Sequence, residues 1–456
     1  MLSAVIGVAQ AARNGRTARV DTIAWYDSPF MEAIVPDKIE LLAPAGCYPS
    51  LRAAIANGAD AVYFGLAQLN MRARARRSFE REDLAEICRI CREAGVKSYM
   101  ALNTVLYEHD LNLCRELLQE AANQQISAVI LSDMAAVMVA QDLGLEVHLS
   151  TQLSISNSES VRFYAPHCDR IVLARELSLP MIDKVHKSII KDNIRGRSGN
   201  LMELEAFAHG ALCIAVSGRC SMSLYSDNAS ANRGACDQNC RKEYIVKDAQ
   251  TGHEMLVDNN YIMSPTDILT LGFVDKMVAA GVMVFKIEGR GRAPEYVGAV
   301  TAAYRKALDA VVDGSFNQEL VEELMPSLEK VYNRGFSSGY YLGQKQGWAE
   351  VGGSKATRQK QTIGTITNVF QKAGVVEVEC TAGKLGINDE YVVIGHTTGA
   401  VQGAVLELRV EDENGVHNPE TVAKGTLFTM PHTGDARRGD QLYRLAPVPA
   451  PAPTKV

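Results

Sequence analysis

Short apolar runs alternate with helical patterns along the chain from residue 39 to about residue 290. Buried parallel strands read as near-continuous apolar runs, and helices are the usual connections between them. Eight such units predict a (β/α)8 barrel of the TIM type, an α/β fold. The eight runs span residues 39–44, 60–65, 96–103, 127–133, 145–152, 169–176, 201–207 and 282–289.

The segment between the second and third runs shows the helical spacing clearly. Leu84, Ile87, Cys88 and Cys91 follow each other at i, i+3, i+4 and i+7, which places them on one apolar face. Cys88 and Cys91 also form a C-x-x-C pair, a spacing typical of redox or metal sites. The helical face favours burial of both thiols in the core.

The barrel pattern breaks between the seventh and eighth runs, where the connection is far too long for a simple crossover. Near the C-terminus, short alternating strands with Gly and Asn/Asp turns predict a small β-barrel domain. We therefore expect a disordered or mis-started extension at 1–38, the barrel domain at 39–345 with a Cys-rich insertion at 208–281, a linker at 346–361, the β-barrel domain at 362–446 and a disordered Pro-rich tail at 447–456.

The composition limits which classes of partner the protein can bind and in which compartment we expect it. The net charge of -6 excludes a global basic field, so any nucleic acid must bind through a local basic patch. No run of 18 apolar residues appears, so we expect no membrane-spanning helix and a cytoplasmic protein. A cytoplasmic chain keeps its thiols reduced, so its 10 cysteines indicate buried thiols or a metal site rather than disulfides.

Polar residues gather at the predicted C-terminal ends of the strands, where a TIM barrel places its active site. One of them alone could be satisfied by loop backbone, but so many at one end favour a functional site. The set comprises Asn103, Ser132, Asp133, Ser150, Gln152, Arg175, Glu176, Glu205, His209, Glu288 and Arg290.

An arginine cluster follows the second strand in the stretch "NMRARARRSF". It contains Arg72, Arg74, Arg76 and Arg77 in an otherwise acidic protein. Guanidinium groups bind phosphates and carboxylates in a bidentate manner, so the cluster is a candidate anion clamp. A solvated loop is the alternative.

The insertion contains Cys213, Cys220, Cys236 and Cys240. Four thiolates can bind zinc or an iron–sulfur cluster, and only the last two cysteines have a spacing typical of a zinc knuckle. Four buried free thiols are one alternative. A cysteine nucleophile is another, since His209 lies four residues before Cys213, although four sulfurs are more than a nucleophile needs.

The stretch "EAFAHGALCIAVSGRCSMS" resembles the signature of the collagenase-like peptidase family of unassigned catalytic type. The agreement continues in "LLAPAG", "GADAVYFG", "HLSTQ", "CDQNCRKEY" and "FKIEGRGRAPEYV", and covers residues 39–345. The matching signature residues are Glu205, Phe207, Gly210, Ala211, Leu212, Cys213, Gly218, Cys220, Met222 and Ser223.

This resemblance implies hydroxylation chemistry. Its branches modify the wobble uridine of tRNA to 5-hydroxyuridine in a prephenate-dependent reaction, hydroxylate a ribosomal RNA cytidine, or hydroxylate ubiquinone precursors without oxygen. The chain is most similar to the tRNA branch in size and in its C-terminal domain. The resemblance implies a [4Fe–4S] cluster on Cys213, Cys220, Cys236 and Cys240, with prephenate as co-substrate.

The leading hypothesis is thus an oxygen-independent tRNA uridine hydroxylation enzyme. The alternatives are a peptidase, as the family name implies, an enzyme that hydroxylates ribosomal RNA or ubiquinone precursors, and a non-catalytic RNA-binding scaffold that carries a structural zinc ion. The candidate catalytic residues are His209, Glu288 and Glu205, of which His209 and Glu288 are the candidates for proton transfer. The candidate substrate-binding residues are Arg72, Arg74, Asn103, Gln152, Arg175 and Arg290, and the four arginines among them are the first candidates for binding the dicarboxylate.

Overall fold

The computed structural model describes residues 39–72, 78–255, 263–350, 352–413 and 415–448. The predicted extension at 1–38 lies outside these described residues, and so do Arg74, Arg76 and Arg77. Pro447, at the start of the predicted tail, is the last residue of strand β22, and residues 449–456 lie outside the described residues.

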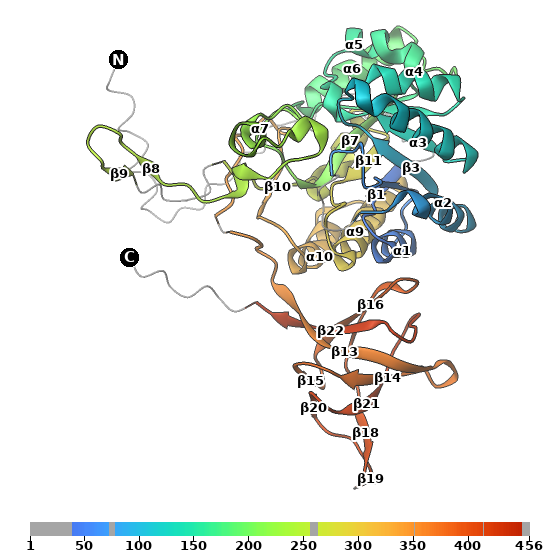
Figure 1. The fold of residues 1–456 in the computed structure, drawn as a ribbon, viewed down its shortest axis with the longest axis vertical. Helices are drawn as coiled ribbons and strands as arrows, with labels where there is room; N and C mark the ends of the chain where they lie inside the picture. The colour runs from blue at the N-terminus through green and yellow to red at the C-terminus, as the bar shows by residue number, and fades with distance from the viewer. Residues whose placement is uncertain (1–38, 73–77, 256–262, 351, 414, 449–456) are drawn as a thin grey trace. The chain divides into compact units, whose positions relative to one another are not determined.

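Eight parallel strands close into a barrel, which confirms the fold that the apolar runs predict (Figure 1). Each strand pairs with the next, and β11 pairs with both β1 and β7 to complete the ring. The strands are β1 (Glu40–Pro44), β2 (Ala61–Phe64), β3 (Lys97–Leu102), β4 (Ala128–Leu131), β5 (Val147–Leu149), β6 (Arg170–Val172), β7 (Glu203–Ala211) and β11 (Val284–Ile287).

Helices cover the outside of the barrel and connect its strands (Figure 1). Their apolar faces and the outward faces of the strands form one continuous core. The helices are α1 (Tyr48–Ala56), α2 (Leu84–Glu93), α3 (Leu111–Asn123), α4 (Met134–Asp142), α5 (Ser158–Tyr164), α6 (Leu179–Lys191), α8 (Val274–Ala279), α9 (Pro294–Val312) and α10 (Gln318–Lys330).

Local sequence signals explain two of these helices. On α2, Cys88 and Cys91 are buried at 3% and 1% exposure, which confirms that this C-x-x-C pair packs in the core. At the start of α4, the Asp133 carboxylate accepts a hydrogen bond from the Ala135 amide at 3.0 Å. Asp133 is therefore a helix cap. Helix capping explains why this polar residue follows a strand, and no contact with a substrate is needed to explain it.

The Cys-rich insertion is anchored to the end of β7. Strand β10 (Asp267–Leu269) pairs antiparallel with β7, with Asp267 opposite Ala211, and β12 (Phe336–Ser337) adds to β10. Strand β12 thus belongs to the barrel sheet although it lies near the end of the predicted barrel domain, well after the insertion. The other elements of the insertion are α7 (Met222–Asp227), β8 (Val246–Lys247) and β9 (Glu254–Met255).

The C-terminal part is β-rich, as its alternating pattern predicts, and has a core of its own around Ile366, Val378 and Phe428. One antiparallel sheet has the order β17-β16-β22-β13-β14-β21-β18-β19, and β15 pairs with β20. The strands are β13 (Arg358–Phe370), β14 (Val375–Cys380), β15 (Lys384–Gly386), β16 (Glu390–Gly395), β17 (Gly399–Ala404), β18 (Arg409–Asp412), β19 (Gly415–His417), β20 (Thr421–Ala423), β21 (Leu427–Pro431) and β22 (Gln441–Pro447).

The interior of the barrel contains charged side chains as well as apolar ones. Arg170 donates to Glu40 at 2.6 Å and lies 3.7 Å from Glu205, whose other oxygen accepts from Lys286 at 2.7 Å. Tyr99 also donates to Glu40 at 2.9 Å. Burial alone would raise the pKa of Glu40, but Arg170 and Lys97 lower it to about 2. The charges inside the barrel are therefore mutually compensated.

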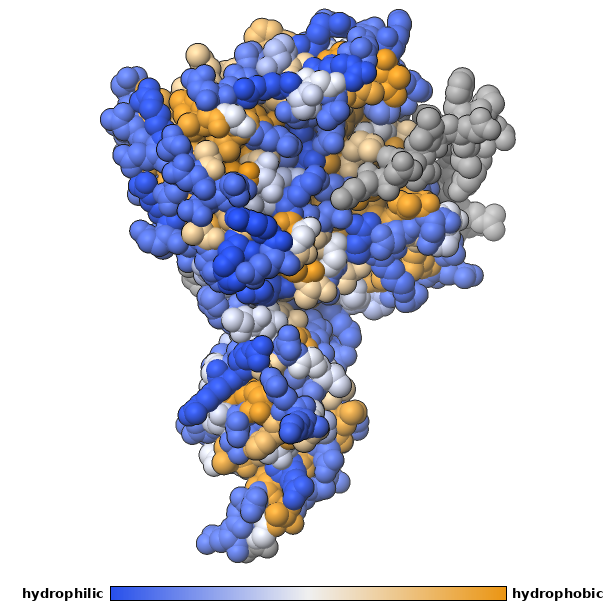
Figure 2. Space-filling view, turned by 90° about the vertical axis from the view of Figure 1, so that its right-hand side faces the viewer, coloured by the Kyte–Doolittle hydropathy of each residue, from blue (hydrophilic) through white to orange (hydrophobic). Residues whose placement is uncertain are grey.

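Apolar side chains appear as separate groups among polar ones on the face shown in Figure 2. Within the described ranges, the helices are either too short or too polar to cross a membrane.

Replacing Arg170 tests this interior network. Arg170→Met should lower the free energy of unfolding by about 3–5 kcal/mol, because the buried Glu40 carboxylate loses its closest charged partner. Arg162→Met, which removes an ion pair with Asp192 at the surface, should cost at most about 1 kcal/mol. Urea unfolding at neutral pH measures both. Equal losses in the two variants would contradict a stabilising role for the network.

Candidate functional site

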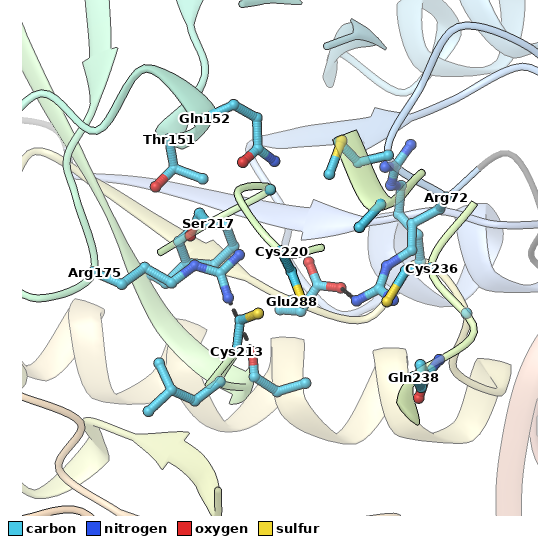
Figure 3. Close-up of a pocket in the computed structure, with 18 of the residues that line it drawn as sticks. Arg72, Thr151, Gln152, Arg175, Cys213, Ser217, Cys220, Cys236, Gln238 and Glu288 are labelled. Carbon is cyan, nitrogen blue, oxygen red and sulfur yellow. Dashed lines mark hydrogen bonds and ion pairs between the residues drawn. The ribbon is translucent and has the colours of Figure 1, made fainter. Parts of the chain in front are cut away.

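A cavity of about 240 Å³ lies at the C-terminal ends of the barrel strands (Figure 3). Its wall includes Asn103 after β3, Gln152 after β5, Arg175 after β6, Ala211 at the end of β7 and Glu288 after β11. Residues of the insertion complete the wall. The cavity, called the barrel cavity below, thus occupies the position where TIM barrels place their active sites.

The four cysteines of the insertion all line the barrel cavity. Figure 3 shows the sulfurs of Cys213, Cys220 and Cys236 around the same space as Glu288. None of the four forms a disulfide. Burial raises the pKa of the Cys240 thiol, Arg241 lowers it, and the other three thiols raise it further. The Cys240 sulfur is therefore close enough to the other three to interact with them electrostatically.

Hydrogen bonds from two arginines fix the insertion around these thiols. Arg241 donates to the Leu212 carbonyl at 2.6 Å, next to Cys213, and to the Pro265 carbonyl at 2.6 Å. Arg233 donates to the Asp110 carboxylate, which begins the α3 segment, and its guanidinium stacks on the Tyr107 ring at 4.1 Å. The thiols are therefore held by protein contacts on both sides of the insertion.

Gly218 allows the insertion to approach the barrel closely. Its φ is +76°, in the left-handed region that favours glycine, and a Cβ atom there would lie 2.8 Å from the Gln152 side-chain oxygen. A side chain at this position would therefore both strain the backbone and push Gln152 out of place. This explains the glycine two residues before Cys220.

A partly exposed ion pair lies in the wall of the barrel cavity. Arg72 Nη2 donates to Glu288 Oε1 at 2.6 Å (Figure 3). The Tyr63 hydroxyl donates to Glu288 Oε2 at 3.2 Å. Burial alone would raise the pKa of Glu288, but Arg72, Arg175 and Arg290 lower it to about 2. Glu288 is therefore ionised at neutral pH.

Positive charge exceeds negative charge along the cavity wall. Glu288 is the single carboxylate among the described lining residues. Within the described part of the chain, Nε of Arg175 and Nε of Arg290 are buried without a hydrogen-bond partner. Buried donors that lack partners favour an anionic ligand. The seven basic lining residues are Arg72, Arg175, Arg241, Lys286, Arg290, Arg292 and Arg334.

The structure brings most of the predicted site residues together and places two elsewhere. The ones that line the barrel cavity are Arg72, Asn103, Gln152, Arg175, Cys213, Cys220, Cys236, Cys240, Glu288 and Arg290. Glu205 lies deeper in the barrel, bonded to Lys286, and His209 lies behind the wall. Arg74 is outside the described residues. Sequence reasoning missed Tyr63, Arg241, Arg334 and above all Lys286, a lysine inside an apolar strand run.

His209 is enclosed by aromatic rings. It is 1% exposed, and its ring centre lies 5.5 Å from that of Tyr304 and 5.7 Å from that of Phe336. Burial, with a smaller effect of Arg292, lowers the pKa of His209 to about 3. A neutral imidazole packed among rings has a structural role, so we assign no proton transfer to His209.

Comparisons with known proteins show the family to which the chain is similar. The model of Peptidase family U32 matches residues 46–350. A collagenase of Porphyromonas gingivalis is 49% identical over 89% of this chain and 97% of its own length. A tRNA hydroxylation protein of Bacillus subtilis is 32% identical over 68% of this chain and 72% of its own. A 23S rRNA 5-hydroxycytidine synthase of Escherichia coli is 33% identical over 68% of this chain and 46% of its own.

The buried state of His209 predicts a specific loss of stability in acid. The unfolded chain binds a proton near pH 6.5 and the folded chain only near pH 3, so stability is complete above pH 6.5 and falls as the pH drops. His209→Phe cannot take up this proton. Between pH 6.5 and pH 5 the wild type should lose about 1.5 kcal/mol relative to this variant.

Urea unfolding at several pH values measures this difference. Tyr304→Phe, which removes a hydroxyl from the same cluster, serves as the control and should lower stability equally at each pH. Parallel pH curves for the wild type and His209→Phe would contradict a neutral, buried His209.

Proposed function

The chain belongs to peptidase family U32, and from this premise we propose that it is an RNA-modifying enzyme that hydroxylates the wobble uridine of tRNA to 5-hydroxyuridine. The observation that carries the proposal is the barrel cavity, where four cysteines and seven basic side chains surround one space. Relatives named for tRNA and rRNA hydroxylation support RNA as the substrate class. The proposed reaction is oxygen-independent, depends on prephenate and takes place in the cytoplasm.

The four thiols of the barrel cavity are the proposed ligands of a [4Fe–4S] cluster. All four line this cavity, and four thiolates are the ligand set of both a structural zinc ion and a [4Fe–4S] cluster. Hydroxylation is a redox reaction and zinc has no redox chemistry, so the proposed RNA hydroxylation favours the cluster over zinc. When bound, such a cluster supplies electron transfer or a site for an oxygen donor.

The arginines of the barrel cavity are the proposed binding groups for the carboxylates of prephenate. Arg290 is 7% exposed and, like Arg175, has a buried Nε–H group without a partner among the described residues. A carboxylate would satisfy these donors and offset the excess positive charge. Asn103, which follows β3, and Gln152, which follows β5, are the proposed contacts for the uracil ring.

Glu288 can orient its neighbouring side chains but cannot donate a proton at neutral pH. Its pKa of about 2 keeps it ionised, and the Arg72 guanidinium occupies one of its oxygens. The ion pair makes Glu288 a weak base, so its main proposed role is to orient Arg72 and Tyr63.

Peptidase activity is the second candidate, because similar proteins are named collagenase. A cysteine protease needs a histidine beside its thiol to act as the base. The described residues that line the barrel cavity include no histidine, and His209 is buried away from it. The geometry therefore supports a cluster site better than a proteolytic one.

Iron analysis tests the cluster. Protein purified without oxygen should contain about four iron atoms and about four sulfides per chain and absorb at about 400 nm. Cys213→Ala, Cys220→Ala, Cys236→Ala and Cys240→Ala should each lose most of this iron, because each removes one thiolate from the cavity wall. Cys380→Ala, in the core of the β-rich part, should keep it. One zinc ion per chain in place of iron would contradict the proposal.

Nucleoside analysis tests the substrate. A bacterial strain without its own tRNA 5-hydroxyuridine should regain the modified nucleoside when it expresses this chain, and mass spectrometry of digested tRNA measures it. Cys380→Ala should restore the nucleoside as the wild type does, and Cys213→Ala should not, because the latter lines the cavity. Gelatin cleavage by the purified wild type that disappears in Cys213→Ala, together with unmodified tRNA, would favour the peptidase.

A further inference from the structure

Lys286 is a buried amine in the wall of the barrel cavity that the proposed function leaves without a role. It lies in the middle of β11 and is 4% exposed. Its Nζ atom lies 2.7 Å from Glu205 Oε1 and 4.4 Å from the centre of the Tyr63 ring. An amine that faces a ligand cavity while a carboxylate holds it from behind is arranged to react with what enters the cavity.

The surroundings of Lys286 make its neutral form accessible. Burial lowers its pKa, Glu205 opposes this effect, and Arg290 adds to it. Glu205 is fully buried, and its Oε2 atom has no hydrogen-bond partner among the described residues. Moving the proton from Lys286 to Glu205 converts a buried ion pair into two neutral groups, which reduces the cost of their desolvation.

Two arginines of the cavity wall indicate which second group a ligand of Lys286 would carry. Arg290 and Arg175 line the same cavity, and each has a buried Nε–H group without a partner in the described part of the chain. Guanidinium groups bind carboxylates, and an uncharged amine attacks carbonyl carbon. A molecule that satisfies both requirements has a carbonyl group next to a carboxylate.

We propose that Lys286 forms an imine with the carbonyl carbon of a 2-oxo acid whose carboxylate is bound by Arg290 and Arg175. The Lys286 ammonium passes one proton to Glu205, and the amine nitrogen bonds to the carbonyl carbon. Glu205 returns the proton to the resulting hydroxyl group, which leaves as water. The ammonium and the carbonyl thus become a protonated imine and one water molecule, with no oxidant or reductant.

In this arrangement Lys286 and Glu205 are both catalytic residues: Lys286 forms the covalent bond, and Glu205 accepts its proton and returns it to the leaving hydroxyl group. The inference rests on the proposed function in one respect, since the bound acid is taken to be the small-molecule co-substrate of that enzyme. The covalent bond would hold the acid at a fixed place in the barrel cavity before the RNA base arrives.

Reductive trapping tests the imine without RNA. The protein, purified without oxygen, is incubated with pyruvate and cyanoborohydride, digested and analysed by mass spectrometry. The peptide that contains Lys286 should carry one reduced pyruvate adduct in most chains. The peptide that contains Lys306, an exposed lysine paired with Glu323, reports random labelling and should remain at least about tenfold less modified. Equal labelling of the two peptides would overturn the proposal.

Two variants sharpen the test. Lys286→Arg keeps the charge but cannot form the imine, so its adduct should disappear. Arg290→Met should reduce labelling at low pyruvate by about tenfold or more, because it removes a charged hydrogen bond to the carboxylate. Replacing pyruvate with lactate, which has no carbonyl group, should give no adduct. Circular dichroism confirms that each variant is folded.

The outcome is independent of the proposed RNA substrate. An adduct on Lys286 in a protein that leaves tRNA unmodified supports the imine and contradicts the RNA proposal. Modified tRNA with no adduct on Lys286, in a wild type whose folding is intact, overturns the imine alone.

Discussion

The ion pairs inside the barrel are the interaction on which the rest of the structure depends. Arg170, with 2% of its side chain exposed, lies between Glu40 and Glu205, and Glu205 in turn holds Lys286. A buried charge without a partner costs several kcal/mol, so these residues must occupy their positions together. They come from β1, β6, β7 and β11, and the network therefore fixes the register of strands that meet where the barrel closes.

This constraint reaches the barrel cavity through Lys286. Strand residues two apart face the same side, so Lys286 and Glu288 both point into the barrel from β11 and the turn that follows it. Lys286 belongs to the charged network of the barrel interior, and Glu288 belongs to the ion pair of the cavity. Tyr63 contacts both, because Lys286 lies over its ring and its hydroxyl donates to Glu288. The cavity contains more cations than carboxylates, which is costly in a buried site. An anionic ligand that binds there therefore stabilises the folded chain, because it offsets the excess positive charge of the cavity.

The sequence could predict the fold because each strand is an apolar run and each helix shows its own spacing. It could also predict much of the cavity wall, since Asn103, Gln152, Arg175 and Glu288 all follow strand ends and one geometric rule brings them together. The same rule failed for Glu205 and His209, which do not line the cavity. Strand β7 continues to Ala211, well past the apolar run that predicted it, so Glu205 lies inside the barrel rather than at its mouth. Strand length depends on the pairing with β10, which the sequence does not display.

Lys286 is a feature that the sequence displays, because it is a lysine inside the apolar run at 282–289. A lysine in the middle of a buried strand needs a partner, and Glu205 is an acid in the neighbouring strand of the closed barrel. The pairing that makes them neighbours appears only when the eighth strand returns to the seventh. A separate pairing places the insertion, because β10 adds to the end of β7, and Cys213 follows that end two residues later. The thiols and the buried amine therefore face one cavity because a single strand, β7, pairs with β11 on one side and anchors the insertion on the other.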